Sequence, residues 1–506
     1  MLLLALWLAC DGKTTPPPAD DSSISTDDSA DDSADDTGDS EDTQPPTNPG
    51  VLMLAGGGSE GEREDQSAWS WALYQGLLSG GDINGDGQVV VAVLSDTDET
   101  DWIPNYFVLL GADSAFNLKI DSRQTAQNDR TAQRISGADA VFLKGGDQGI
   151  YYDLWNDTAT EAAILDLWSR GGGVGGTSAG AMSQSEYCLS GSADYVSADV
   201  LTDSHTVYLD DVSEPGTSGV HTDFLNLLGG AYVDTHFTER GRLGRLLGVM
   251  ARAIDEGAPQ SLVGIGLEQQ TGLLVQGRVA QVYGVGTVSL VHASASPVRE
   301  PGKGLVWTDL RLDVLTAGAS FDLDSGELDP GPNAEAITGQ TPAGPAPADW
   351  SAHGQDADDA ERFAWVVSSA PYSTRAGSAD PTLPASFGLL DAHNRDTRGL
   401  SQELCLRGLF EHPGALCALV GEDGVLRSDS GLIGAAGADG DPEQSAILID
   451  SSAATFRALS PDISPYDAGD GSLHAAGLTG LTVQVLARSE SLGLWYDPAT
   501  RSVSSR

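Results

Sequence analysis

The sequence predicts an α/β fold, in which a doubly wound, mainly parallel sheet is covered by helices and followed by a small mixed or β-rich module. From Val51 onward, short apolar runs alternate with helix-like stretches, which is the pattern of a parallel sheet with crossover helices. A glycine-rich strand end at Gly173–Gly175 leads into a helix start made of small residues. With 506 residues, 40 % of them hydrophobic, the chain can form a sizeable core and more than one domain.

The N-terminal residues predict export. Met1–Cys10 is an apolar run too short to cross a bilayer as a helix, and we interpret it as a signal segment. It ends in Leu8-Ala9-Cys10 before a polar stretch and looks like a bacterial lipobox, so Cys10 is the residue expected to carry a lipid anchor. An ordinary export signal with an incidental cysteine is the alternative. We expect a cell-surface or outer-membrane lipoprotein, or a secreted protein.

Charge and composition narrow the classes of partner. Residues 11–50 are dominated by Asp, Ser, Thr and Pro, which predicts a disordered acidic tether. The whole chain has 26 Lys+Arg against 74 Asp+Glu and a net charge of −48, which repels phosphate backbones and anionic lipids. We therefore expect no nucleic-acid partner, and membrane contact only through Cys10. A homodimer remains open.

The body of the chain alternates predicted strands and helices. The strands are Val51–Ala55, Val89–Leu94, Phe116–Ile120, Ala138–Leu143 and Gly173–Gly175, and the helices are Gln66–Leu78, Gln124–Ile135 and Ala159–Trp168. Ligands bind such sheets at the carboxyl ends of the strands, so the loops there are expected to carry the chemistry. The stretch Asp82–Gly87 resembles the start of a calcium loop, but Val93 stands where a bidentate acid is required. We favour a tight acidic turn, with calcium as the alternative.

The stretch Gly175–Ala181 carries the strongest functional signal. Ser178 stands in a Gly-x-Ser-x-Gly setting between a strand and a helix, which is typical of a nucleophile elbow. In such a turn the amide of Ala179, at the helix N-terminus, faces the oxyanion. Gly146, in the loop after the strand Ala138–Leu143, is expected to supply a second amide to the oxyanion. The alternative is a glycine-rich helix start that binds phosphate.

Three motifs in a fixed order give a family resemblance. They are Phe142–Gln148, Gly176–Ala181 and Asp234–Leu246. Together they resemble the cyanophycinase branch of the S51 serine peptidases, which shares a flavodoxin-like fold with class I glutamine amidotransferases. The resemblance covers roughly residues 51–330. It disfavours a true α/β-hydrolase, in which the catalytic histidine lies much further beyond the elbow.

The resemblance implies a serine-type catalytic triad. Ser178 is the expected nucleophile, and His236 is the expected general base that later protonates the leaving amine. A hydroxyl needs such an imidazole, because it is a weak nucleophile until its proton is taken. The triad acid lies between serine and histidine in the family, and the best positional match is Asp199. Asp194 and Glu186 remain alternatives.

The resemblance also implies a substrate pocket. The residues that fall where cyanophycinases place recognition residues are Gln148, Asp234, Arg240, Arg242 and Arg245. Arginines near the catalytic histidine suit bidentate recognition of substrate carboxylates. The alternative is that they pair with acids such as Asp234 and Glu239. Thr235 stands where the family has Gln, which puts a preference for β-linked Asp-Arg units in doubt.

The remaining chain predicts further strands, a linker and an unassigned module. The strands are Val263–Leu267, Thr271–Gln276 and Gln281–Leu290, and Leu305–Asp324 resembles the closing segment of the family. We place the catalytic domain at residues 51–329, a linker at 330–348 and a C-terminal module of unknown function at 349–506. In the module, Ala415–Val420, Ser445–Ile449 and Leu481–Leu486 are apolar.

The spacing of the cysteines is compatible with one disulfide and does not indicate a metal site. Cys405 and Cys417 could form a disulfide in an exported protein, which leaves Cys188 unpaired. The spacing contains no zinc-binding pattern, so neither a metal nor another cofactor is expected.

These observations predict an exported serine peptidase of the cyanophycinase-like type. It would hydrolyse amide bonds of aspartate-containing peptides or polymers, cyanophycin being the most specific case, through an acyl-enzyme. The alternative is a surface-displayed binding protein that kept the fold and lost turnover.

Overall fold

The computed structural model describes the part of the chain that contains most of the predicted motifs. The described residues are 50–98, 100–190, 197–209, 219–331, 335–337, 364–365, 387–391, 402, 405–406, 409, 416–420, 424–429, 432–437, 446–451, 453–458, 476–486, 494–497, 500 and 502–505. The predicted signal, the tether and Asp194 lie outside them, as does nearly all of the predicted linker.

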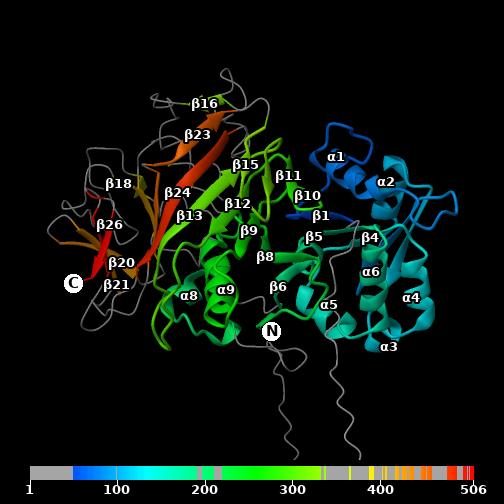
Figure 1. The fold of residues 1–506 in the computed structure, drawn as a ribbon, viewed down its shortest axis with the longest axis horizontal. Helices are drawn as coiled ribbons and strands as arrows, with labels where there is room; N and C mark the ends of the chain where they lie inside the picture. The colour runs from blue at the N-terminus through cyan, green and yellow to red at the C-terminus, as the bar shows by residue number, and fades with distance from the viewer. Residues whose placement is uncertain are drawn as a thin grey trace, which may run out of the picture. The chain divides into compact units, whose positions relative to one another are not determined.

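The first sheet has nine strands in the order β15-β14-β11-β10-β1-β5-β4-β2-β3 (Figure 1). The strands are β1 (Val51–Ala55), β2 (Val90–Ser95), β3 (Ser114–Lys119), β4 (Ala140–Leu143), β5 (Gly173–Thr177), β10 (Thr271–Gln276), β11 (Val279–Gly284), β14 (Ser320–Asp322) and β15 (Leu328–Asp329). Strands β1, β5, β4, β2 and β3 pair in parallel, whereas β10, β11, β14 and β15 extend one edge with antiparallel pairings.

Helices cover both faces of this sheet, as the doubly wound pattern predicts. One face packs against α1 (Trp69–Gly76), the 3-10 turn η1 (Leu77–Gly80) and α2 (Trp102–Leu110); the other packs against α3 (Arg123–Ala126), α4 (Asp129–Ser136), α5 (Gln148–Trp155) and α6 (Ala159–Ser169). Successive side chains of a strand point to opposite faces, so Met53 joins the first core and its neighbours Leu52 and Leu54 join the second. The predicted fold class is confirmed.

A second sheet carries the remaining elements of the site. Within the described residues it has 13 strands, with the main path β17-β18-β19-β22-β24-β13-β12-β9-β8-β6-β7. The strands are β6 (Ser185–Leu189), β7 (Val220–His221), β8 (Leu228–Thr235), β9 (Val263–Leu267), β12 (Val288–His292), β13 (Trp307–Leu315), β16 (Glu335–Ile337), β17 (Ala364–Trp365), β18 (Phe387–Asp391), β19 (Leu416–Val420), β22 (Ala446–Asp450), β23 (Thr455–Ala458) and β24 (Ala476–Leu486). Strands β6, β8 and β9 pair in parallel, and β9, β12 and β13 continue in antiparallel pairing.

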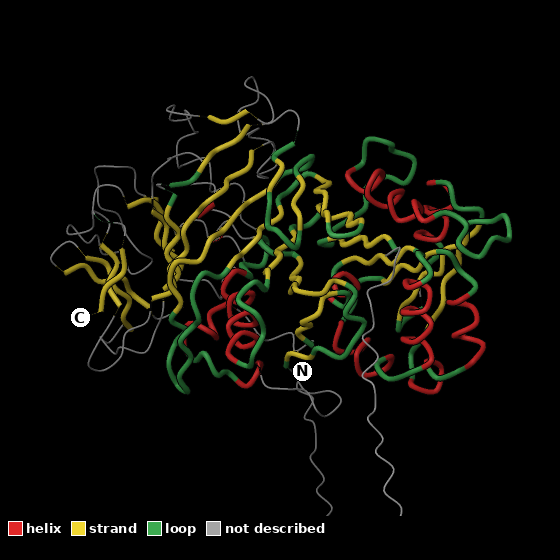
Figure 2. The backbone as a smooth tube through the Cα atoms, viewed as in Figure 1, coloured by secondary structure: helices red, strands yellow, loops and turns green. Residues whose placement is uncertain are grey.

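Residues of the predicted C-terminal module take part in this second sheet. Strand β13 pairs antiparallel with β24, with Trp307 opposite Val485, and the two arrows lie side by side in Figure 1. A separate small sheet contains β20 (Gly424–Asp429), β21 (Leu432–Gly437), β25 (Leu494–Asp497) and β26 (Ser502–Ser505). Other helices of the described residues are α7 (Ala179–Met182), α8 (Ser197–Thr202), η2 (Val207–Leu209) and α9 (Leu243–Asp255). In Figure 2 the described residues of the C-terminal side are drawn mainly as strands. The division into domains stays a prediction.

Several predicted elements differ from the observed ones for local reasons. The predicted helix Gln124–Ile135 is two helices, because the Asn128 side chain accepts a hydrogen bond from the amide of Arg130 and starts α4. The predicted strand Gln281–Leu290 is divided between β11 and β12. The Asp82 carboxylate accepts hydrogen bonds from the amides of Gly85, Asp86 and Gly87, which is the tight acidic turn that the sequence favours.

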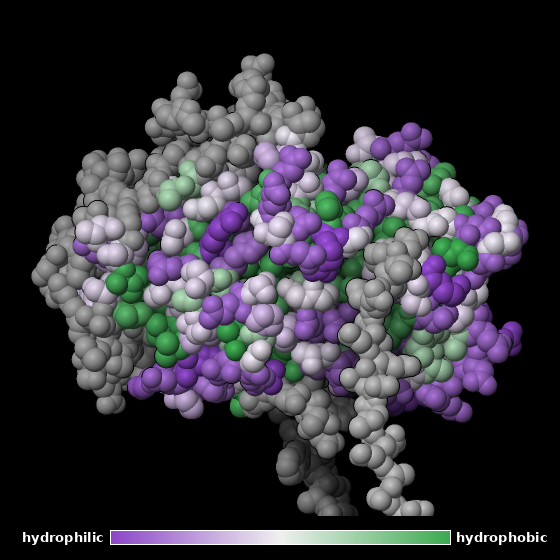
Figure 3. All heavy atoms as spheres, viewed as in Figure 1, coloured by the Kyte–Doolittle hydropathy of each residue, from purple (hydrophilic) through white to green (hydrophobic). Residues whose placement is uncertain are grey.

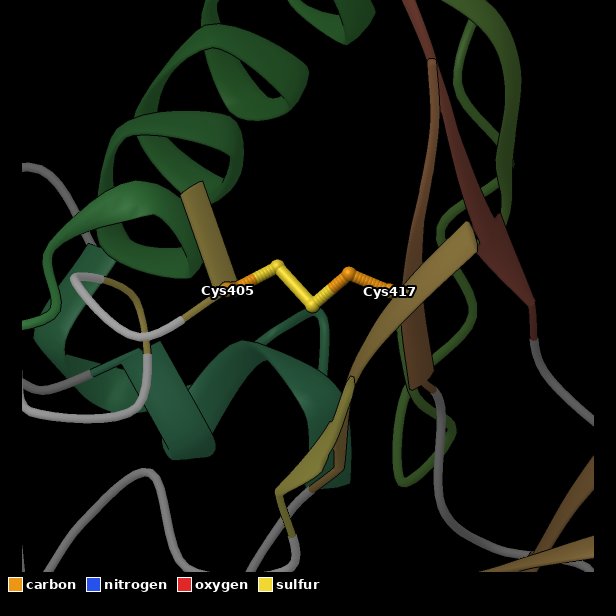
Figure 4. Close-up of a disulfide and its surroundings, with 2 residues drawn as sticks. All are labelled: Cys405 and Cys417. Carbon is orange, nitrogen blue, oxygen red and sulfur yellow. A yellow bond between two sulfur atoms is a disulfide. The ribbon is translucent and has the colours of Figure 1, made fainter. Parts of the chain in front are cut away.

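The predicted disulfide between Cys405 and Cys417 is present, and both cysteines are buried (Figure 4). Cys188 is a buried free cysteine, as expected.

Among the described residues, no three His, Cys, Asp or Glu side chains are grouped so that they could bind a metal. Figure 3 shows hydrophilic and hydrophobic residues interspersed over the described part of this face. No helix among the described residues is both long and apolar enough to span a bilayer.

The close crossing of β5, α7 and β4 generates a stability prediction. A Cβ at Gly180 would lie 2.2 Å from the carbonyl oxygen of Leu143, whereas one at Gly229 would meet nothing within 4 Å. We expect Gly180→Ala to lower the free energy of unfolding by about 1–3 kcal/mol, the usual cost of overpacking. Gly229→Ala should change it by no more than about 0.5 kcal/mol. Urea unfolding checks both, and equal effects of the two substitutions would contradict the crowding at Gly180.

Candidate active site

Ser178 occupies the sharp turn between β5 and α7. Its backbone has φ 53° and ψ −118°, a conformation that side chains rarely adopt, and its amide donates to the carbonyl of Ala55 at 2.9 Å. A Cβ at Gly176 would lie 2.4 Å from the backbone of Gly180, so strand and helix can approach this closely only with glycine there. The chain thus folds into the predicted elbow, with the hydroxyl at the carboxyl end of the first sheet.

His236 reaches the same point from the second sheet. It follows the last residue of β8, has φ 47°, and its amide donates to the carbonyl of Gly56 at 3.0 Å. A Cβ at Gly57 would lie 2.3 Å from Cε1 of the imidazole, so the loop after β1 also needs glycine for this approach. The distance from His236 Nε2 to Ser178 Oγ is 2.8 Å. The structure therefore brings together the two residues that the sequence predicts as base and nucleophile.

The other nitrogen of the imidazole contacts Gln269, a residue that the sequence analysis missed. Gln269 Nε2 lies 3.0 Å from His236 Nδ1, and the Gln269 amide donates to Glu239 Oε1 at 2.8 Å. For Nε2 to accept the Ser178 proton, Nδ1 must carry the hydrogen and Gln269 must present its oxygen to it. Rotation of the Gln269 side-chain amide by half a turn exchanges its nitrogen and oxygen. The observed position of Gln269 is therefore compatible with the tautomer that carries the hydrogen on Nδ1.

The side chain opposite His236 Nδ1 is Gln269 and not the predicted Asp199, and the identity of the triad acid stays a prediction. Asp199 lies in α8, which packs on α9. The alternative Glu186 accepts a hydrogen bond from the amide of Gly230, on the strand β8 beside its own, and Asp194 lies outside the described residues. The signal that could have found Gln269 is its position directly after the predicted strand Val263–Leu267, at the carboxyl edge where the site was expected.

The environment of His236 strongly favours the neutral imidazole. The residue is only 8 % exposed, and this burial, together with the charges of Arg240 and Arg242, lowers its pKa to about 3, although Asp234 acts in the opposite direction. A neutral imidazole can accept a proton from Ser178 at any pH well above that value.

Asp234, Arg242 and Arg245 form one buried ion network. Arg245 donates to both oxygens of Asp234, one of them at 2.7 Å, and Arg242 donates to Asp234 at 3.2 Å and to the carbonyl of Thr235 at 2.6 Å. Burial by itself raises the pKa of Asp234, but the two arginines outweigh it, and the pKa is lowered. Their charged groups face one another and link the end of β8 to the start of α9, which is the alternative pairing considered from the sequence. Their role in substrate binding stays a prediction.

Gln148 and Arg240 are the remaining residues of the predicted pocket. Gln148 donates its side-chain amide to the carbonyl of Leu189 at 2.6 Å and is buried, so this group supports the backbone. Arg240 is exposed, and it acts electrostatically on His236. The loop after β4 lies beside the nucleophile, since a Cβ at Gly145 would lie 3.4 Å from the Cβ of Ser178. The Tyr151 hydroxyl donates to the carbonyl of Lys144 at 2.9 Å and braces this loop.

The predicted oxyanion donors Ala179 and Gly146 lie close to Ser178 along the chain or in the neighbouring loop. Ala179 is the first residue of α7, so its amide has no acceptor within the helix. Gly146 follows Gly145 in the loop that lies beside Ser178. The roles of these two amides stay predictions.

The sequence of this chain is similar to those of known peptidases. Residues 107–281, which include Ser178, His236 and Gln269, match the model of peptidase family S51. The cyanophycinase of Trichormus variabilis is 28% identical to this chain over 226 residues, which cover 43% of this chain and 68% of the relative. The cyanophycinase of Geminocystis herdmanii is 26% identical over 223 residues, which cover 43% of this chain and 74% of that relative. A crystal structure of a peptidase from an acI-B1 Actinobacterium aligns with a TM-score of 0.37 and 19% identity, over 55% of this chain and 98% of that one. The predicted resemblance to S51, cyanophycinase-like peptidases is confirmed, and with it a hydrolase of the peptidase class.

The contact between Gln269 and His236 generates a prediction on pH dependence. A protonated imidazole cannot take the Ser178 proton, so the acid limb of kcat/KM should follow the pKa of His236, near 3, and activity at pH 5 should match that at pH 7. Gln269→Glu places a carboxylate against Nδ1, which favours the charged imidazole and should raise the acid limb by about 1–3 pH units.

Gln270→Glu is the matched control, because the side chain of Gln270 contacts the carbonyl of Ser59 instead of the imidazole. Its acid limb should stay with that of the wild type. An unchanged acid limb in Gln269→Glu would show that Gln269 does not act on His236.

Proposed function

We propose that the chain is an exported, serine-type peptidase that hydrolyses amide bonds of aspartate-containing peptides or polymers through an acyl-enzyme. The observation that carries the proposal is the 2.8 Å contact between Ser178 Oγ and His236 Nε2 at a glycine-flanked turn. A hydroxyl held in a strained turn against a neutral, buried imidazole is the arrangement that activates it as a nucleophile.

In the first half of the reaction, Ser178 Oγ attacks the carbonyl carbon of the substrate and its proton moves to His236 Nε2. The negative charge that develops on the substrate oxygen is stabilised by the amides of Ala179 and Gly146, each worth roughly 3 kcal/mol in the transition state. His236 then gives the proton to the leaving nitrogen, the C–N bond breaks, and the amine departs. Gln269 accepts a hydrogen bond from Nδ1–H and holds the ring in place throughout.

In the second half, water attacks the ester formed on Ser178. His236 Nε2 takes a proton from the water as its oxygen bonds to the carbonyl carbon, and the same amides stabilise the new oxyanion. When the C–O bond to serine breaks, the proton returns to Ser178 Oγ. The products are the free carboxylic acid and the regenerated site, so two proton transfers through one imidazole complete the cycle.

The substrate assignment rests on charge and on the named relatives. Arg240 is an exposed cation on the turn that follows His236, and a guanidinium binds a carboxylate through paired hydrogen bonds. Several relatives of this chain are cyanophycinases. We therefore propose that Arg240 binds an aspartyl carboxylate of the substrate, with cyanophycin as the first polymer to test.

The proposal of export rests on the N-terminal sequence and on the disulfide. Disulfides persist in oxidising compartments, and the chain has a buried one between Cys405 and Cys417. The lipobox-like ending at Cys10 and the acidic tether after it suit a body held away from a membrane surface.

A second candidate function is a binding protein that retains the peptidase fold. One observation favours it: an amide, Gln269, stands where a carboxylate would stabilise the imidazolium that forms during turnover. An amide can still orient the ring, so this observation alone does not remove catalysis.

A fluorophosphonate probe separates the two functions. We expect the probe to label the wild type, Ser178→Ala to abolish labelling, and kcat on any substrate to fall by at least about 10³-fold in that variant. Incubation with cyanophycin should release Asp-Arg dipeptides, as measured by mass spectrometry. Labelling without dipeptides would remove cyanophycin but keep the peptidase, and equal signals from wild type and Ser178→Ala would support the binding protein.

Lipidation can be measured directly. When the chain is expressed in a bacterial host, we expect the wild type to partition into a detergent phase, because acyl chains at Cys10 bury methylene groups there. Cys10→Ser should move the protein to the aqueous phase, and Cys188→Ser, at a buried free cysteine, should not. Identical partitioning of the wild type and Cys10→Ser would argue against the anchor.

A further inference from the structure

We propose that Gln402, from the C-terminal part of the chain, is a positioning residue of the active site: it holds the turn Phe237–Arg242 that follows the catalytic histidine. The inference rests on the proposed function, since it assigns a role within that site. It also gives a function to a region in which the sequence reveals no family.

The first contact of Gln402 completes the start of α9. The residue before this helix is Arg242, whose side chain makes no capping hydrogen bond. Gln402 Oε1 instead accepts a hydrogen bond from the amide of Leu243 at 2.9 Å, and the contact is buried. The first amides of a helix lack acceptors within it, so a glutamine distant in sequence performs the capping here.

The second contact lies at the other end of the same turn. Gln402 Nε2 is 3.5 Å from the hydroxyl of Thr238, a buried residue two positions after His236. Between these points the backbone folds back on itself, with the amide of Arg240 donating to the His236 carbonyl and that of Arg242 to the Phe237 carbonyl. One buried amide thus spans the turn from Thr238 to Leu243.

Gln402 is itself held firmly. Its neighbours Cys405, Leu406 and Leu409 are fully or almost fully buried in the hydrophobic core that surrounds α9. The disulfide joins Cys405 to Cys417 on β19, and β19 pairs with β22 in the second sheet (Figure 4). A side chain that is only 1 % exposed and anchored in this way can transmit the position of the C-terminal strands to the turn.

The turn carries the charges that control the catalytic histidine. The groups that act on His236 are Arg240 and Arg242 from the turn and Asp234 and Arg245 from β8 and α9. Glu239, also in the turn, accepts the backbone hydrogen bond of Gln269, whose side chain contacts the imidazole. A displaced turn would therefore change both the electrostatic field at His236 and the partner of Nδ1.

The test compares Gln402→Met with Gln484→Met. Gln484 is a matched control: it is also 1 % exposed, its Oε1 accepts from the amide of Asp309 and its Nε2 donates to the Asp309 side chain, both at 2.9 Å. These contacts join β24 to β13 and involve none of the site residues. Each substitution removes one buried, hydrogen-bonded side-chain amide. A decrease in melting temperature that both variants share is therefore due to the loss of a buried amide and not to an effect on the active site.

The principal readout is the titration of His236 by NMR, with the resonance assigned from a His236→Asn sample. In the wild type and in Gln484→Met we expect the imidazole to stay neutral to about pH 4. In Gln402→Met the midpoint should rise by at least one pH unit, because the arginines move away and water enters. Fluorophosphonate labelling of Ser178 at pH 7 should slow about tenfold in this variant alone. Thr238→Val, which removes only the weaker contact, should give a smaller shift in the same direction.

An unchanged His236 midpoint in Gln402→Met, or an equal shift in Gln484→Met, would overturn the proposal. The titration requires no turnover, so a wild type that is not labelled would reject the peptidase while the midpoints still decide the role of Gln402.

Discussion

The hydrogen bond between Ser178 and His236 depends on the meeting of two sheets, and the local architecture is arranged around that meeting. Ser178 directly follows β5 of the first sheet, and His236 directly follows β8 of the second. The bridge between them is the loop after β1, where the Gly56 carbonyl binds the His236 amide and Gly57 lies against the ring. Any side chain at Gly57 would overlap the imidazole, so backbone contact between the sheets fixes the distance between nucleophile and base.

Electrostatics adds a second constraint. In a chain with a net charge of −48, a cluster of three arginines beside the histidine reverses the local field. One carboxylate, Asp234, neutralises part of the cluster and ties two of the arginines to the strand that carries His236. The result is an imidazole that is desolvated and surrounded by positive charge, and hence a base that stays unprotonated while the acidic side chains of the protein remain ionised.

The described C-terminal residues matter to this site because they complete a core that surrounds α9. Helix α9 is buried along nearly its whole length, and its core includes Leu406, Leu409 and the strand β19 as well as residues of β13. Strand β24 lies between β13 and β22, which carries the hydrogen-bonded ladder from the peptidase-like region into the C-terminal strands. Helix α9 starts at the active site and packs against these strands. Its apolar contacts therefore connect the two regions, in addition to the hydrogen bond of Gln402.

The sequence by itself determined the features that arise from local patterns. Short apolar runs located the strands Val51–Ala55, Val263–Leu267 and Thr271–Gln276 with their observed bounds. The glycines around Ser178 specified the elbow, because backbone sterics act over a few residues. Only the tertiary structure decided which polar side chain faces Nδ1 of His236, which arginines pair with Asp234, and which distant residue caps α9. Those contacts join segments of different sheets, so their partners depend on how the sheets pack, and a pattern read along one chain could offer Asp199 where the fold places Gln269.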